Sequence, residues 1–125
     1  MPSFNKVILR NVLYIYVIIV LLLVILPLNS ATTANDIFVL KLRADYLFHI
    51  FMFIPWAFFQ AVFRLNLLHW LLIGLFFAST AEGLQYFLPY RAFNINDLLA
   101  NLLGVMAGFA VLILYHFTTK NRNRI

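Results

Sequence analysis

The chain has 125 residues, of which 65% are hydrophobic, 18% are aromatic and 10% are charged. A soluble domain is roughly half apolar and about a quarter charged, so this composition excludes a soluble domain and indicates an integral membrane protein. The length allows one domain, residues 1–125, without a separate soluble catalytic module. The absence of cysteine excludes disulfides, thiolate metal sites and a cysteine nucleophile. The net charge of +5 arises mostly from cations near the two ends.

Four apolar stretches have about 20 residues each, the length that a helix needs to cross a hydrocarbon core of roughly 30 Å. They lie at about residues 11–28, 45–63, 65–88 and 97–117. The short connections between the later stretches are typical of antiparallel neighbours. We therefore predict an all-α fold, a four-helix transmembrane bundle. Pro55 is expected to kink the second helix, because proline has no amide hydrogen to donate.

The first apolar stretch has an alternative interpretation as a cleavable secretory signal. Lys6 and Arg10 precede it, and a small polar segment, residues 29–34, follows it. A signal core has about 7 to 15 apolar residues, and this run is longer, which favours a retained helix. Cleavage stays open as the alternative, and both interpretations orient the start of the chain identically.

The distribution of Lys and Arg predicts the orientation in the membrane. Cytoplasmic loops carry an excess of these residues. With a cytoplasmic N-terminus, that side would hold six of them, and the other side would hold three. We therefore expect both termini to be cytoplasmic in a multi-pass protein of the bacterial cytoplasmic (inner) membrane. The cytoplasmic group would be Lys6, Arg10, Arg64, Lys120, Arg122 and Arg124, and the outer group Lys41, Arg43 and Arg91.

Polar side chains of three predicted helices should share one outer layer. At a rise of about 1.5 Å per residue, a side chain four residues along a helix lies about 6 Å deeper, on the same face. This spacing relates Asp45 to His49 at the start of the second helix, and Asp97 to Asn101 at the start of the fourth. Ionisable groups are costly in hydrocarbon, so their convergence predicts a functional site. The candidate ligand-binding residues are Asp45, His49, Glu82, Gln85, Arg91, Asp97 and Asn101.

Glu82 is the most demanding of these residues, because hydrocarbon does not solvate a carboxylate. We expect it to pair with a neighbour such as Arg91 or His49, or to lie in a wet cleft. Gly104 and Gly108 form a small-xxx-small pair, which predicts close helix packing. Asn94 or Asn96 is expected to cap the fourth helix.

The remaining aromatic and hydroxyl residues suggest structural roles. Trp56 and Trp70 are interpreted as lipid-facing or interfacial anchors, and Tyr86 and Tyr90 as part of an aromatic belt. Ser79 and Thr80 are expected to bond backbone carbonyls one turn back.

The segment from Glu82 to Gly108 resembles the signature of the VanZ-like family, small bacterial membrane proteins named after a teicoplanin resistance protein. Asp45 and His49 extend the resemblance to the second helix, and together the matching parts cover about half of the chain. The chain departs from the pattern at Tyr46, where the family often has Lys, and at Asn94, where Asp or Ser is commoner. The resemblance implies a four-helix inner membrane protein that, in some members, lowers sensitivity to a lipoglycopeptide antibiotic. The resemblance does not indicate that the protein catalyses a particular reaction.

Four hypotheses for function follow. The leading one is an outward-facing polar cleft that binds a headgroup or a lipid-linked envelope molecule and modulates teicoplanin susceptibility, with Arg91 taking phosphate or carboxylate. The second is an intramembrane enzyme that acts on a lipid-linked phosphate or ester, with His49 as base and a carboxylate as orienter or metal ligand. The third is a transporter or proton path that uses Glu82. The fourth is a packed bundle whose polar residues only cap and join helices.

The leading hypothesis implies a binding protein rather than an enzyme, with no cofactor and no metal. Its expected partners are the lipid bilayer and a lipid-linked envelope precursor or lipoglycopeptide, without nucleic acid. An oligomer stays open, as does the identity of the ligand.

Overall fold

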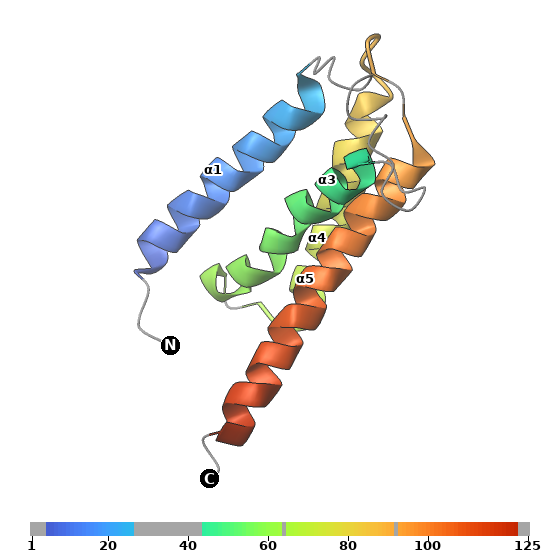
Figure 1. Ribbon diagram of the computed structural model, residues 1–125. Coiled ribbons are helices and arrows are strands. Elements are labelled where there is room, and N and C mark those ends of the chain that lie inside the picture. The colour runs from blue at the N-terminus through green and yellow to red at the C-terminus, as the bar shows by residue number, and fades with distance from the viewer. Residues whose placement is uncertain (1–4, 27–43, 64, 92, 123–125) are drawn as a thin grey trace.

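The computed structural model describes residues 5–26, 44–63, 65–91 and 93–122. Within these ranges the chain forms helices and no strand, and four helical segments are long and apolar enough to cross a membrane. Figure 1 shows them side by side along one general direction, with both termini at the same end of the bundle. The predicted all-α, four-helix fold is confirmed.

Helix α1 extends over Lys6–Ile25 and begins before the predicted residue 11. The side chain of Asn5 accepts a hydrogen bond from the amide of Val7 at 3.2 Å, so it caps the helix start. This contact satisfies one of the amides that a helix leaves unpaired in its first turn. Lys6 and Arg10 therefore belong to the helix itself, on its exposed surface.

The second membrane-crossing segment consists of two helices in series, α3 (Ala44–Phe53) and the 3₁₀ helix η1 (Ile54–Val62). The change falls one residue before Pro55, whose nitrogen has no hydrogen for the carbonyl four residues earlier. Next to this break, the hydroxyl of Tyr16 in α1 donates to the carbonyl of Met52 at 2.8 Å. The proline thus tightens the helix instead of only bending it.

Helix α4 extends over Leu67–Gln85 and starts at Asn66, whose side chain accepts from the amide of His69 at 2.8 Å. It ends three residues before the predicted residue 88. Successive amides there bond to carbonyls three residues back, which continues the chain as tight turns. Ser79 and Thr80 each bond the carbonyl four residues back at 2.8 Å, as predicted.

Helix α5 (Ile95–Arg122) has 28 residues and packs against α3, η1 and α4. On the side toward α3 and η1, glycines allow the backbones to approach closely. A Cβ at Gly104 would overlap the carbonyl oxygen of Ile50, and one at Gly108 would overlap that of Ile54. Because these contacts are with backbone, a larger side chain would have no flexible neighbour to displace. Helix α1 packs against α4 and η1.

Trp56 and Trp70 lie inside the bundle, which corrects their interpretation as lipid-facing anchors. Only 5% and 2% of their surfaces are exposed. Their rings stack with centroids 4.5 Å apart, and each indole nitrogen donates to the backbone carbonyl of the other residue, at 3.2 and 3.0 Å. The hydrogen bonds satisfy the only polar atom of each ring, so both indoles can be buried in an apolar core.

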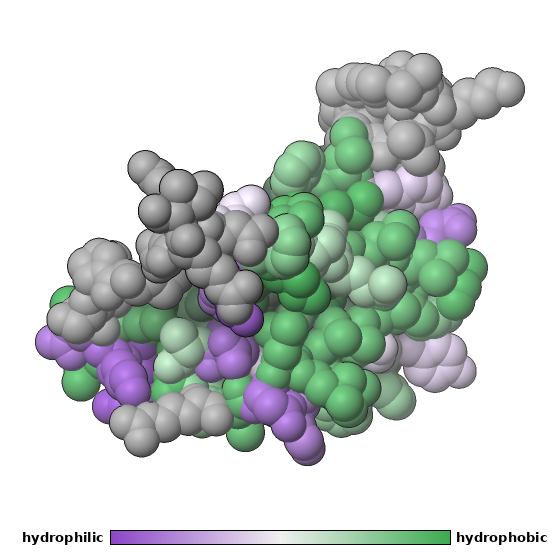
Figure 2. Space-filling model, turned by 90° about the horizontal axis from the view of Figure 1, so that it is seen from below, coloured by the Kyte–Doolittle hydropathy of each residue, from purple (hydrophilic) through white to green (hydrophobic). Residues whose placement is uncertain are grey.

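Large hydrophobic side chains cover most of the described outer surface. Leucine, isoleucine, valine and phenylalanine side chains stand exposed along α1, α4 and α5. Figure 2 shows this surface from the end that carries the termini, with hydrophilic residues in smaller groups among the hydrophobic ones. A surface of this kind is suited to lipid rather than water.

Candidate functional site: a buried polar network

Four polar side chains from three helices meet inside the bundle at the end opposite the termini. His49 comes from α3, Glu82 from the last turn of α4, and Asp97 and Asn101 from the first turns of α5. We call these four residues the polar network. Glu82 and Asn101 are fully buried, with 0% and 1% of their surfaces exposed, while His49 and Asp97 are half-buried.

Glu82 uses both of its carboxylate oxygens. Oε1 accepts from the backbone amide of Asn94 at 3.1 Å, and Oε2 accepts from Nδ2 of Asn101 at 3.5 Å. A buried carboxylate without partners would be very costly, and these donors offset part of that cost. Arg91 and His49, the partners expected from the sequence, do not supply these hydrogen bonds.

Asn101 connects Glu82 to His49. Because its amide nitrogen donates to Glu82, its oxygen Oδ1 is the atom that faces Nδ1 of His49, at 2.9 Å. This orientation requires a hydrogen on Nδ1, since an amide oxygen can only accept. The other ring nitrogen, Nε2, lies 3.9 Å from Oδ2 of Asp97, too far for a direct hydrogen bond. The imidazole is therefore oriented by its Nδ1 hydrogen bond, and Nε2 points toward Asp97 without bonding to it.

The start of α5 is tied to the end of α4 through Asn94. Its side chain accepts from the amide of Asn96 at 3.0 Å, so Asn94 is the cap, and its own amide donates to Glu82. Asp97 lies in the first turn of α5, where the helix dipole favours a negative charge. Glu82 thus fixes the residue from which α5 begins.

Arg91 and Tyr90 reach a different element, the C-terminal end of α1. Nη2 of Arg91 donates to the carbonyls of Leu23 and Leu26, at 3.2 and 2.7 Å. The hydroxyl of Tyr90 donates to the carbonyl of Ile25 at 2.9 Å. Helix ends leave these carbonyls without internal partners, and a cation is favoured there. The connection between α4 and α5 therefore holds α1 in place.

Sequence reasoning missed this role of Arg91, although one signal was available. Helix α1 has no basic residue in its last turn, so its terminal carbonyls require donors from elsewhere in the chain. Arg91 has no ion pair with a carboxylate among the described residues. Its Nε is buried and has no hydrogen-bond partner there.

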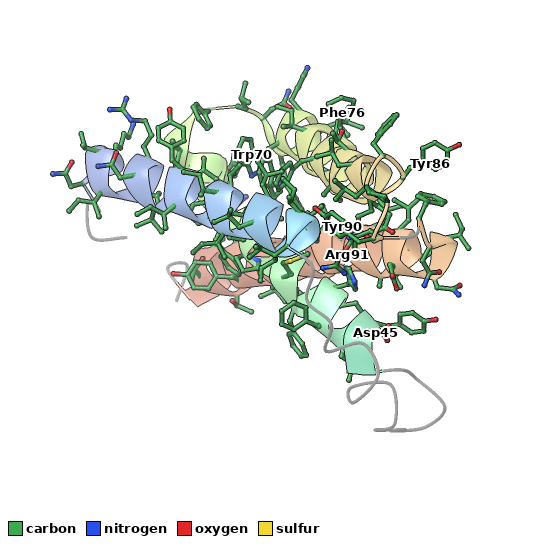
Figure 3. The ribbon with its side chains drawn as sticks, turned by 90° about the horizontal axis from the view of Figure 1, so that it is seen from above. Asp45, Trp70, Phe76, Tyr86, Tyr90 and Arg91 are labelled. Atoms are coloured by element: carbon green, nitrogen blue, oxygen red, sulfur yellow. The ribbon has the colours of Figure 1, made fainter. Side chains whose placement is uncertain are left out.

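The remaining candidate residues lie around the network. Gln85 is buried one turn beyond Glu82, with 4% of its surface exposed. Asp45 lies in the first turn of α3, and its Oδ1 accepts from the amide of Tyr46 at 3.1 Å. Figure 3 shows Arg91 between the end of α1 and α3, with Asp45 farther out along α3. The described residues include no group of three His, Cys, Asp or Glu side chains placed to hold a metal ion.

These features define a class: a small polytopic membrane protein with a hydrogen-bonded polar network buried at one end of a four-helix bundle. The chain belongs to the VanZ/LLP1 family, whose model matches residues 12–116 and thus includes most of α1 and all of the polar network. The family resemblance predicted from the sequence is confirmed. Neither a curated protein nor a solved structure matches the chain.

Proposed function

We propose that this protein binds an anionic envelope ligand, a lipid headgroup or a lipid-linked molecule, at Arg91, and thereby modulates the susceptibility of the cell to lipoglycopeptides such as teicoplanin. One observation carries the proposal. Arg91 is a partly exposed cation with no carboxylate partner among the described residues, held at the polar end of the bundle.

The chemistry of the guanidinium group suits this role. It has five N–H donors in a planar fork, which match the oxygens of phosphate or carboxylate. Nη2 is used by the two carbonyls of α1, and that contact orients the group. Nε is buried and has no hydrogen-bond partner there, and Nη1 makes no hydrogen bond with the described residues, so Nη1 is the donor that an anion would reach. An arriving anion would thus meet a cation whose position is already fixed.

The polar network has a supporting part in this proposal. The carboxylate of Glu82 is occupied by Asn94 and Asn101, so it does not neutralise Arg91 by direct contact. It instead holds the ends of α4 and α5, from which the connection carrying Arg91 projects. His49 and Asp97 are half-buried beside it and are suited to contact polar groups of the same ligand.

Orientation supports an outward-facing site. Lys6 and Arg10 of α1 and Lys120 of α5 are exposed, and the start of α1 lies at the same end of the bundle as the end of α5. Arg91 binds the opposite end of α1. The excess of cations on the cytoplasmic side then directs the polar network toward the outer leaflet of the bacterial inner membrane. There it would meet lipid-linked envelope precursors and the antibiotics that bind them.

The experiment compares Arg91→Ala and Arg91→Lys with Arg10→Ala, which removes an exposed cation at the other end of α1. Each variant is produced at equal membrane abundance, and teicoplanin susceptibility and surface-bound labelled lipoglycopeptide are measured. We expect Arg91→Ala to match cells lacking the protein, Arg91→Lys to be intermediate, and Arg10→Ala to match the wild type. Wild-type behaviour of a folded Arg91→Ala protein would remove the proposal.

The oriented imidazole favours a second candidate function, an intramembrane hydrolase with His49 as general base. Asn101 holds Nδ1, which leaves Nε2 to face Asp97 and any ligand that enters beside it. Turnover of a lipid-linked phosphate or ester by purified protein, lost in His49→Gln, would establish this activity. Lipid binding without turnover in wild type and variant alike would exclude it.

A further inference from the structure

A second feature is an apolar groove on the surface of the bundle, which extends from near the polar end to about the middle of α1. It lies between α1 on one side and α3 and the start of η1 on the other, with a volume of about 330 Å³. The hydroxyl of Tyr16, a polar group in the lining of the groove, donates a hydrogen bond to the carbonyl of Met52. The groove is lined by Tyr16, Ile19, Val20, Leu23, Phe48, Phe51, Met52 and Pro55.

The groove arises from how α1 docks. Helix α1 packs against η1 and α4, and the groove opens where it passes α3. Its α1 wall follows one helix face from Tyr16 to Leu23, a length of about 10 Å at 1.5 Å per residue. The groove therefore runs along the helices, as a lipid chain does in a bilayer.

Arg91 lies at the outer end of this groove. Leu23 lines the groove, and its carbonyl accepts the hydrogen bond from Nη2 of Arg91 at 3.2 Å. The view along the bundle in Figure 3 shows Arg91 between the end of α1 and α3, the two helices that form the walls. A cation without a carboxylate partner among the described residues thus lies at one end of an open apolar groove.

We infer that the groove holds one hydrocarbon chain of a lipid whose net-negative phosphate headgroup pairs with Arg91. This inference rests on the proposed function and names the ligand class of that site: the lipid itself, with both its headgroup and its chain recognised. The charge of Arg91 and the apolar walls below it match the two parts of such a molecule in their natural order across the leaflet.

The two parts contribute differently. A lipid chain gains little from leaving other lipid tails for an apolar groove, because both surroundings are equally apolar. Preference for one lipid over another must therefore come from the charge-assisted contact at Arg91, while the groove fixes the position of the chain. Lipid preference is therefore tested at Arg91, and chain placement at the α1 wall of the groove.

The first experiment uses the purified full-length protein with dioleoyl phosphatidylglycerol and dioleoyl phosphatidylcholine, and measures bound lipid by native mass spectrometry. Ile19→Trp fills the groove, and Ile18→Trp adds the same bulk on an exposed position of α1 outside it. We expect the wild type to prefer phosphatidylglycerol by roughly tenfold and Arg91→Ala to lose that preference, as a charged hydrogen bond of ordinary strength requires. Ile19→Trp should lower phosphatidylglycerol binding about threefold or more, while Ile18→Trp binds as the wild type does.

The outcomes separate the groove from the headgroup site. If Arg91→Ala abolishes the lipid preference while Ile19→Trp and Ile18→Trp behave alike, the groove is overturned and the proposed function stands. If the wild type shows no preference for phosphatidylglycerol, the inferred class of lipid is wrong. The proposed function is then still tested separately by the teicoplanin susceptibility assay. Thermal unfolding of each variant in detergent shows that the comparison is made between folded proteins.

A second measurement needs no substitution. Phosphatidylglycerol with a photoreactive group in one acyl chain is crosslinked to the wild-type protein in nanodiscs, and the modified residues are mapped. We expect the crosslinks to concentrate in residues 16–23 and 48–55. Crosslinks spread evenly to exposed residues of α5, such as Leu114 and Phe117, would overturn the inference, because they would show only the lipid that surrounds any membrane protein.

Discussion

Glu82, at the end of α4, accepts a hydrogen bond from the backbone amide of Asn94, the cap of α5, at 3.1 Å. A buried carboxylate thus holds the start of the next helix by its main chain. The same carboxylate binds the side chain of Asn101 two turns into α5. The end of α4 and the beginning of α5 are therefore joined at two points by one residue.

Glu82→Ala is expected to destabilise the bundle. Removing the carboxylate leaves the Asn94 amide and the Asn101 amide nitrogen without their acceptor, at a cost of about 1 to 3 kcal/mol. Glu82→Gln keeps one acceptor oxygen and should lose less. Thermal or denaturant unfolding in detergent measures the difference, with Ser79→Ala on the exposed face of α4 as the control. Equal stability of Glu82→Ala and Ser79→Ala would contradict this role.

Arg91→Ala should loosen α1, because the carbonyls of Leu23 and Leu26 lose their shared donor. The chain has no cysteine, so cysteines introduced at the exposed residues Ile18 and Leu72 can be spin-labelled specifically. Electron–electron distance measurements between α1 and α4 should then give a broader distribution in Arg91→Ala. Tyr90→Phe should show a smaller effect, and Arg10→Ala none. An unchanged distribution in Arg91→Ala would show that the hydrogen bonds of Arg91 do not hold α1 in place.

Gly104→Ala and Gly108→Ala are expected to force α5 away from α3 and η1, because each new methyl group would overlap a backbone carbonyl. Overpacking of this kind costs about 1 to 3 kcal/mol. Gly83→Ala is the matched control, since nothing lies within 4 Å of a Cβ there. It should be neutral or stabilising by up to about 1 kcal/mol, the helix propensity of alanine over glycine. Unfolding curves of the three variants test the contrast.

Trp56→Phe should cost about 1 kcal/mol, because the ring stays apolar but its hydrogen bond to the Trp70 carbonyl is lost. Trp56→Ala should cost roughly 3 to 5 kcal/mol through the cavity that it leaves. The exposed Phe76 provides a control, since Phe76→Ala removes a ring that faces outward. A double-mutant cycle with Trp70→Phe measures the coupling of the two indoles. Additive effects would show that the reciprocal hydrogen bonds do not act together.

Composition and apolar run length were sufficient to predict the helices, because both report directly on what a bilayer requires. Local chemistry was also readable. Asn94 caps α5, and Ser79 and Thr80 bond carbonyls of their own helix, since these contacts involve residues a few positions apart. Helix rise along the chain placed His49, Glu82, Asp97 and Asn101 at one level, and the structure brings these four together.

The hydrogen-bond partners of the buried side chains could not be predicted from the sequence, because they depend on how each helix is rotated about its axis. Glu82 was expected to pair with Arg91 or His49, yet one of its hydrogen-bond donors is the backbone amide of Asn94. Every residue except proline has such an amide, so the residue type does not indicate this partner. Trp56 and Trp70 are typical interfacial residues by composition, but each supplies the acceptor that the other needs in the core. Such reciprocal pairs become visible only when two segments are placed side by side.

The 3₁₀ helix that contains Pro55 also has a consequence for how the protein fits its bilayer. A 3₁₀ helix rises about 2.0 Å per residue, against about 1.5 Å in an α-helix. With ten residues in α3 and nine in η1, the second segment therefore extends to about 33 Å instead of about 28 Å. A segment that would be marginally short as a regular α-helix is thereby long enough to span the hydrocarbon core of the bilayer. The bilayer around it therefore needs no local thinning.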